Sequence, residues 1–65
     1  MEGLDPDSRA IVEAIGSKTR HVDDIIDITQ LKAARVLASL TLLEIRGIVK
    51  QSAGKKYTVV PHPAE

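Results

Sequence analysis

The side chains with the most evident chemistry in this 65-residue sequence are the cations of its second half. Residues 31–46, LKAARVLASLTLLEIR, space their apolar side chains by three and four, which predicts a helix from about 32 to 46. One exposed stripe of that helix and a later lysine pair supply the predicted DNA-binding residues, which are Lys32, Arg35, Ser39, Arg46, Lys55 and Lys56. Ammonium and guanidinium groups bind phosphate, so the pattern favours contact with a DNA backbone. We expect Lys32, Arg35 and Lys55 to point outward on a common side.

The charge balance limits the strength of that contact. Nine basic and nine acidic residues give a net charge of zero, which argues against strong general affinity for nucleic acid. The charges are nevertheless unevenly distributed. Seven acids and three basic residues in 1–27 give −4, and six basic residues and two acids in 28–65 give +4. Because there is no Phe or Trp and the single Tyr is expected in the core, no base-stacking platform is predicted. We expect weak binding without sequence readout, opposed by Asp23, Asp24 and Asp27 of the preceding helix.

One apolar residue interrupts the polar stripe of the third helix. Leu42 lies between Ser39 and Arg46 on the same predicted face. Single exposed apolar side chains are common on protein surfaces, but this one is the candidate protein-interaction residue. Docking to another protein, or to a second copy of the chain, therefore stays open beside DNA binding.

Residue types that support catalysis or metal binding are sparse. The chain has no cysteine, and the whole core sequence separates His21 from His62. A metal site needs three or four converging ligands, so we predict none and interpret His21 as a helix cap or a surface residue. The serines lack a histidine–acid relay, and residues 52–57, SAGKKY, lack the flanking strand and helix of a phosphate loop. We expect no enzyme activity, no cofactor and no small-molecule substrate.

Two helices are expected to precede the cationic one. Asp5 as N-cap, Pro6 at the first helical position and Gly16 as the terminating residue predict a helix from about 6 to 15. Residues 19–22, TRHV, form a brief strand or an extended segment before a second, shorter helix. His21 and Asp24 have the spacing of a capping box there. The predicted buried side chains of this helix are Ile25, Ile26 and Ile28.

A β-hairpin is expected after the third helix. The predicted core stripe of that helix is Ala33, Val36, Leu40 and Leu43. Gly47 then supplies the positive φ that reverses the chain without strain. The segments IVKQS and KYTVV, residues 48–52 and 56–60, are predicted strands around a turn that contains Gly54. The side chains expected to cover the open side of the core are Ile48, Val49, Tyr57 and Val59.

This order of elements predicts an α+β, mainly α, fold: a winged helix-turn-helix with three helices and a two-stranded β-hairpin wing. We expect a single domain over residues 1–65, ordered from about 5 to 60, with 61–65 as a tail. No apolar run approaches the ~20 residues of a membrane span. Because a secreted domain of this size usually needs disulfides, the absence of cysteine favours the reducing cytoplasm.

The sequence from the first helix to Val60 resembles the C-terminal winged-helix domain of the DNA-processing protein DprA, also called Smf. The dense stretch VLASL, followed by LLEIRGIV, favours this family over a transcriptional regulator. The positions that match the family pattern are Asp24, Ile25, Thr29, Leu31, Val36, Leu37, Leu40, Leu43, Glu44, Gly47, Ile48, Val49, Gly54 and Tyr57. Gln30 stands where the family often has Gly, which predicts a different backbone at that turn. Leu42 stands where a polar residue is common.

The resemblance implies a role in natural transformation. DprA proteins bind incoming single-stranded DNA in competence and recombination and help to load the RecA recombinase onto it. A larger Rossmann-like domain performs the main DNA binding and dimerisation in that family. The present chain is therefore expected to be an accessory domain whose partners are DNA, RecA, the Rossmann-like domain or a second copy.

Two alternatives to that role are kept. One is a small winged-helix transcriptional regulator, although such a regulator normally carries a dimerising helix that does not fit in 65 residues. The other is a module that acts only through protein–protein interaction or dimerisation.

Overall fold

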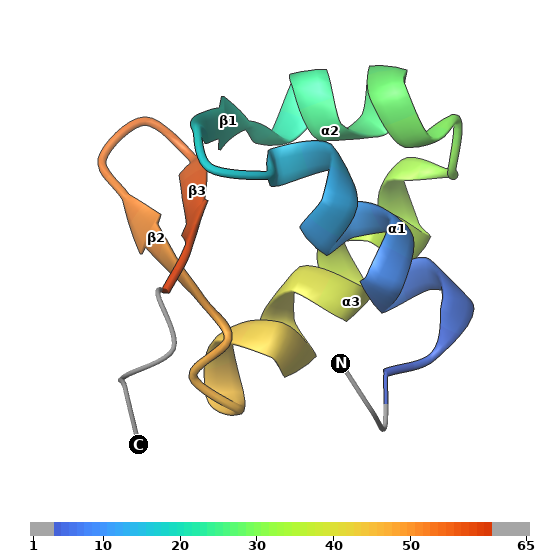
Figure 1. The fold of residues 1–65 in the computed structure, drawn as a ribbon. Helices are drawn as coiled ribbons and strands as arrows, with labels where there is room; N and C mark the ends of the chain where they lie inside the picture. The colour runs from blue at the N-terminus through green and yellow to red at the C-terminus, as the bar shows by residue number, and fades with distance from the viewer. Residues whose placement is uncertain (1–3, 61–65) are drawn as a thin grey trace.

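The structure is a computed structural model that describes residues 4–60. Its elements in chain order are α1 (Pro6–Ile15), β1 (Thr19–His21), α2 (Val22–Thr29), α3 (Ala33–Ile45), β2 (Val49–Ser52) and β3 (Lys56–Val59). Helix α1 packs on both α2 and α3, and the β2–β3 hairpin lies to the left of the helices in Figure 1. Three helices and a small antiparallel sheet confirm the predicted winged-helix fold class.

Helix α1 begins and ends where the sequence predicts. Asp5 occupies the N-cap position with an extended backbone, and Pro6 is the first helical residue. Gly16 follows the last residue with a φ of +60°, which glycine adopts easily because it has no Cβ. Ile11 and Ile15 of this helix are essentially inaccessible to solvent and form its contribution to the core.

Helix α2 is capped by His21, as predicted, but through the amide of the second helical residue. The imidazole Nδ1 accepts a hydrogen bond from the backbone N–H of Asp23 at 3.0 Å. At the other end of the helix, Gln30 adopts a left-handed conformation with a φ of +61°. Glycine also adopts this conformation readily. The expected difference from the family's backbone at this turn stays a prediction.

The buried side of α2 differs from the prediction at one position. Ile25 is fully buried and Ile26 is half-buried, whereas Ile28 is 49% exposed. The prediction is wrong at Ile28 because the core-facing stripe of α2 runs through Val22, Ile25 and Ile26. At 100° per residue, Ile28 lies beyond the edge of that stripe.

Helix α3 is one residue shorter at each end than predicted, and its central stripe is the core of the domain. Val36, Leu40 and Leu43 are at most 1% exposed, as expected from their spacing. Ala33, predicted in the same stripe, is exposed because the first turn of α3 borders a surface groove. Gly47 then turns the chain with a φ of +78°, which confirms the predicted corner.

The sheet has three strands where two were predicted. Its order is β1-β3-β2, and both pairs are antiparallel. The short segment before α2 is indeed a strand, and it pairs Thr19 with Thr58 and His21 with Lys56 along the second edge of β3. This pairing satisfies backbone groups that a two-stranded wing leaves unpaired on β3, which explains why the extra strand forms.

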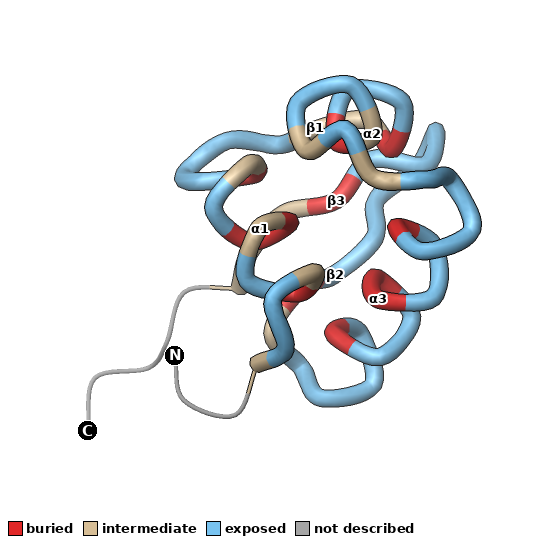
Figure 2. The backbone as a smooth tube through the Cα atoms, turned by 90° about the vertical axis from the view of Figure 1, so that its right-hand side faces the viewer, coloured by how far each residue is buried: buried red, intermediate tan, exposed pale blue. Residues whose placement is uncertain are grey.

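The core lies where the three helices meet the inner side of the sheet. Figure 2 shows the buried segments of α1, α3 and β3 turned toward the interior. The core side chains are Ile11, Val12, Ile15, Val22, Ile25, Val36, Leu40, Leu43, Val49 and Tyr57. Of the predicted cover, Val49 and Tyr57 are buried, and Ile48 and Val59 are half-buried against the cluster. Among residues 4–60, no helix has the length and apolar character needed to cross a bilayer.

The contrast between two leucines of α3 tests this core. Leu40→Ala should lower the free energy of unfolding by about 2–5 kcal/mol, because it opens a cavity in a fully packed interior. Leu42→Ala, on the exposed side of the same helix, should change it by about 0.5 kcal/mol or less. Urea denaturation followed by circular dichroism measures both values. Equal effects for the two variants would contradict the described packing.

Candidate nucleic-acid interface

The residues of the predicted cationic stripe of α3 have different environments: the two at its ends are exposed, one forms an ion pair and one is buried. Lys32 is the exposed N-cap residue of α3. The Nε and Nη2 atoms of Arg35 donate to the two carboxylate oxygens of Asp7 on α1, at 2.8 and 3.0 Å. Ser39 is 7% exposed, so its predicted place on an outward stripe is wrong. The reason is that Ser39 lies one turn after Arg35, on the flank of α3 that packs against α1.

The ion pair changes what Arg35 contributes to a DNA-binding surface. Both oxygens of Asp7 are engaged by the guanidinium, so the positive charge is compensated within the domain. At the other end of α3, Arg46 is the exposed C-cap residue. The helix therefore presents charge near its two ends rather than along its length.

The outward face of α3 is apolar, and we call its three large side chains the α3 apolar face. Leu37, Leu42 and Ile45 are 48%, 57% and 76% exposed. The exposure of Leu42 was predicted, whereas that of Leu37 and Ile45 was missed. Their positions outside the Val36–Leu40–Leu43 spacing are the signal that would have found them.

The polar groups on the same side of α3 are few. Ala34 and Ala38 are exposed beside the α3 apolar face. The hydroxyl of Thr41 donates to the backbone carbonyl of Leu37 at 2.9 Å, so its proton is already engaged. Readout of base edges relies on guanidinium, amide and hydroxyl groups. The middle of α3 offers almost none of them to a major groove.

The wing supplies the other predicted cations. Lys55 lies in the turn between β2 and β3 with a φ of +60°, and Lys56 is the first residue of β3. Both side chains are exposed, and no ion pair found within residues 4–60 involves either. The backbone carbonyl of Lys55 accepts a hydrogen bond from the N–H of Val22 at 3.0 Å, which fixes the wing tip to the start of α2.

The expected common side for Lys32, Arg35 and Lys55 does not exist. Lys55 borders a groove together with Ala33 and Leu37 of α3. Arg35 follows Ala33 by two positions, about 200° around the helix axis, and contacts α1. Lys55 and Arg35 therefore lie on opposite flanks of α3.

A surface groove lies beside Lys55. It has a volume of about 290 Å³ and lies between α2, α3 and the hairpin. Its apolar walls include Val22, Ile26 and Leu37, and Asp23 and Lys55 stand among its polar groups. Tyr57 lines the groove from β3, and burial raises the pKa of its phenol above the ordinary value of 10.0, with a further contribution from the charge of Glu44.

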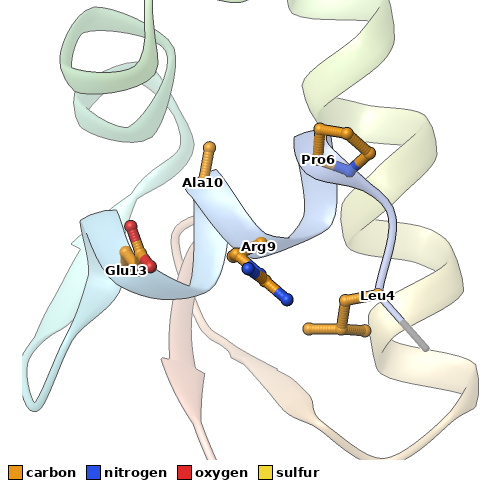
Figure 3. A pocket seen from close by; sticks show the side chains of 5 residues that line it. All are labelled: Leu4, Pro6, Arg9, Ala10 and Glu13. Atoms are coloured by element: carbon orange, nitrogen blue, oxygen red, sulfur yellow. The ribbon is translucent and has the colours of Figure 1, made fainter. Parts of the chain in front are cut away.

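Another hollow lies along α1 and has a volume of about 410 Å³. Figure 3 shows Arg9 pointing toward Leu4, with Glu13 one turn farther along the helix. A cation and an acid at this spacing offset one another, so the hollow has no marked preference for an anion.

The described residues hold no group of three or more His, Cys, Asp or Glu side chains that could bind a metal ion. His21, one of the two histidines considered above, acts as the cap of α2. His62 lies outside the described residues, as does the predicted tail.

Comparison with known proteins gives one match. The family model described as the DprA winged helix domain matches residues 2–55. The match covers all three helices, β1 and β2, and it ends one residue before β3 begins. No curated protein and no solved structure matches the chain.

The raised pKa of Tyr57 gives a spectroscopic test of the groove. Tyr57 is the only tyrosine, so absorbance of the tyrosinate reports its titration alone. The midpoint should be higher in the folded domain than in urea, and Glu44→Gln should remove the smaller part of the difference. Because the folded pKa is the higher one, stability is fully present below about pH 10 and falls as the pH rises through the folded pKa. A folded midpoint at or below the value in urea would contradict the burial of the phenol.

Proposed function

Since the chain belongs to the family of DprA winged helix domains, we propose that it is the accessory domain of a DprA-like DNA-processing protein that acts in natural transformation. Domains of this family are non-catalytic and of a DNA-binding type. In the proposed role, the domain adds weak contacts to DNA while a Rossmann-like domain holds the single strand on which RecA is loaded. The protein acts in the cytoplasm, consistent with a chain that has no cysteine.

The main observation that supports the proposed DNA contact is the exposure of two lysines on the wing. Lys55 and Lys56 are adjacent and exposed, and no ion pair found in residues 4–60 compensates them. Flexible ammonium groups of this kind bind phosphate oxygens without regard to base sequence. Lys32 and Arg46 at the two ends of α3 are further candidates for phosphate contact. Arg35 contributes less, because Asp7 already compensates its charge.

Binding of this kind is weak and independent of sequence. The α3 apolar face lacks the donors and acceptors that distinguish base pairs. Tyr57, the only residue of the Phe, Tyr and Trp types in the sequence, is 8% exposed and cannot stack with bases. Asp23 and Asp24 in the first turn of α2 add repulsion toward phosphates.

Salt dependence tests DNA contact directly. The domain should bind labelled single-stranded and duplex oligonucleotides at low salt, with affinity that falls steeply as salt increases. Lys55→Ala together with Lys56→Ala should weaken binding about tenfold and reduce the salt slope by about two, while the melting temperature stays unchanged. Fluorescence anisotropy measures both quantities. No measurable binding of the unmodified domain at low salt would remove the DNA-contact proposal for this domain.

Protein docking is the second candidate function, and the α3 apolar face favours it. Leu37, Leu42 and Ile45 are large apolar side chains exposed on one helix. The apolar groove beside Leu37 continues this surface toward α2. Exposed apolar surface adjoining a concave site is common where proteins associate.

One substitution separates docking from DNA contact. Leu42→Glu should abolish association with RecA, with the Rossmann-like domain or with a second copy, and leave the fold intact because the side chain is 57% exposed. Analytical ultracentrifugation detects self-association, and pull-down with purified RecA or Rossmann-like domain detects the others. Lys18→Glu, a charge change outside α3, is the control. Unchanged association in all three assays would exclude docking through Leu42.

A further inference from the structure

The register of the sheet separates its side chains into two groups. Partners directly opposite one another in antiparallel strands point to the same side, and successive residues alternate. Tyr57 faces the core, and it is paired with Arg20 and Gln51. The side chains on the opposite side form what we call the outer sheet face, which consists of Thr19, His21, Lys50, Ser52, Lys56 and Thr58.

The outer sheet face contains no carboxylate. It carries two lysines, one histidine and three hydroxyls drawn from all three strands. Lys50 stands opposite Thr58, and Lys56 stands opposite Ser52. The two ammonium groups are thus diagonal neighbours, whose Cβ atoms are roughly 7–8 Å apart in antiparallel sheets. This placement spreads positive charge across the face without setting two lysines directly against each other.

The histidine of this face presents a donor even when it is neutral. The Nδ1 atom of His21 accepts the N–H of Asp23, so the proton of the neutral ring is on Nε2. The hydroxyls of Thr19 and Thr58 are 2.9 Å apart, and whichever accepts in that bond keeps its own proton free to donate. The face therefore consists of cations and neutral donors, a composition suited to anionic oxygens. One acid, Asp23, lies beside the face, with its Oδ2 3.7 Å from Nδ1 of His21.

We propose that the outer sheet face binds the phosphodiester backbone of DNA, with Lys50 and Lys56 as its ionic contacts and the threonine and serine hydroxyls as neutral donors. The proposal rests on the DNA contact proposed above and assigns it to this surface. Lys50 did not belong to the predicted set, because the sequence does not show the register that brings residues of different strands to one side of the sheet. The α3 apolar face, in contrast, offers no row of donors to phosphates.

The composition of the outer sheet face also determines how DNA lies on it. His21 is the only aromatic side chain of the face, and its ring caps α2, so the face has no row of rings on which successive bases could stack. Contacts from lysine and hydroxyl groups to phosphate position a strand without reading its sequence. The same face accepts a single strand or one strand of a duplex.

Charge reversal at matched positions tests the assignment in the full 65-residue chain. Lys50→Glu should weaken binding to single-stranded and duplex oligonucleotides about tenfold and reduce the salt slope by about one, by fluorescence anisotropy at low salt. Arg9→Glu makes the same change of charge on α1 and should alter affinity by about twofold or less. Lys50→Gln provides a milder variant, and circular dichroism confirms folding. Asp23→Asn should strengthen binding.

The outcomes separate this proposal from the one it rests on. If the unmodified domain binds DNA but Lys50→Glu binds equally well, the outer sheet face is not the site and DNA contact by another surface stands. An equal loss for Lys50→Glu and Arg9→Glu would reflect net charge alone and overturn the assignment. No binding at low salt overturns both proposals. Tight binding to anionic phospholipid vesicles, sensitive to Lys50 and stronger than binding to DNA, would assign the face to lipid instead.

Discussion

Strand β3 is the one strand of the sheet that pairs along both edges, and the rest of the structure depends on that position. Its four residues join β1, which precedes α2, to β2, which follows α3. Its alternation places Tyr57 against the core while Lys56 and Thr58 face outward. In a domain of 65 residues with a single aromatic ring, closure of the core and presentation of charge are therefore performed by the same short segment.

Much of the fold follows from local chemistry that is readable in the sequence. Pro6, Gly16 and Gly47 lie where helices begin or end, and His21 caps α2. These signals act over a few residues, so spacing alone is enough to find them. The pairing of β1 with β3 joins residues 39 positions apart, as in the contact between Thr19 and Thr58. No local pattern predicts such a partner, because it depends on where α2 and α3 carry the intervening chain.

The candidate site was less predictable than the fold, and Ser39 and Arg35 show why. Sequence spacing groups residues by helix face, but it does not say which flank a neighbouring helix covers. Packing of α1 buries Ser39, and Asp7 of α1 engages Arg35. What remains outward on α3 is Leu37, Leu42 and Ile45. The cations predicted on α3 are therefore weaker candidates for a DNA-contact surface than the cations of the strands. In the strands, the register determines which side chains lie on one face.

The hydrogen bond from Val22 to the carbonyl of Lys55 has a consequence for the motion of the wing. In a winged helix whose hairpin is attached only at its base, the tip can swing, and ordering it on a ligand costs conformational entropy. Here the hydrogen bond from Val22 anchors the tip to α2, and β1 pairs with the outer edge of β3. The hairpin is therefore held at its tip and along one edge as well as at its base. Any surface that it presents is shaped before a ligand arrives, and the entropy of ordering its backbone was already lost during folding.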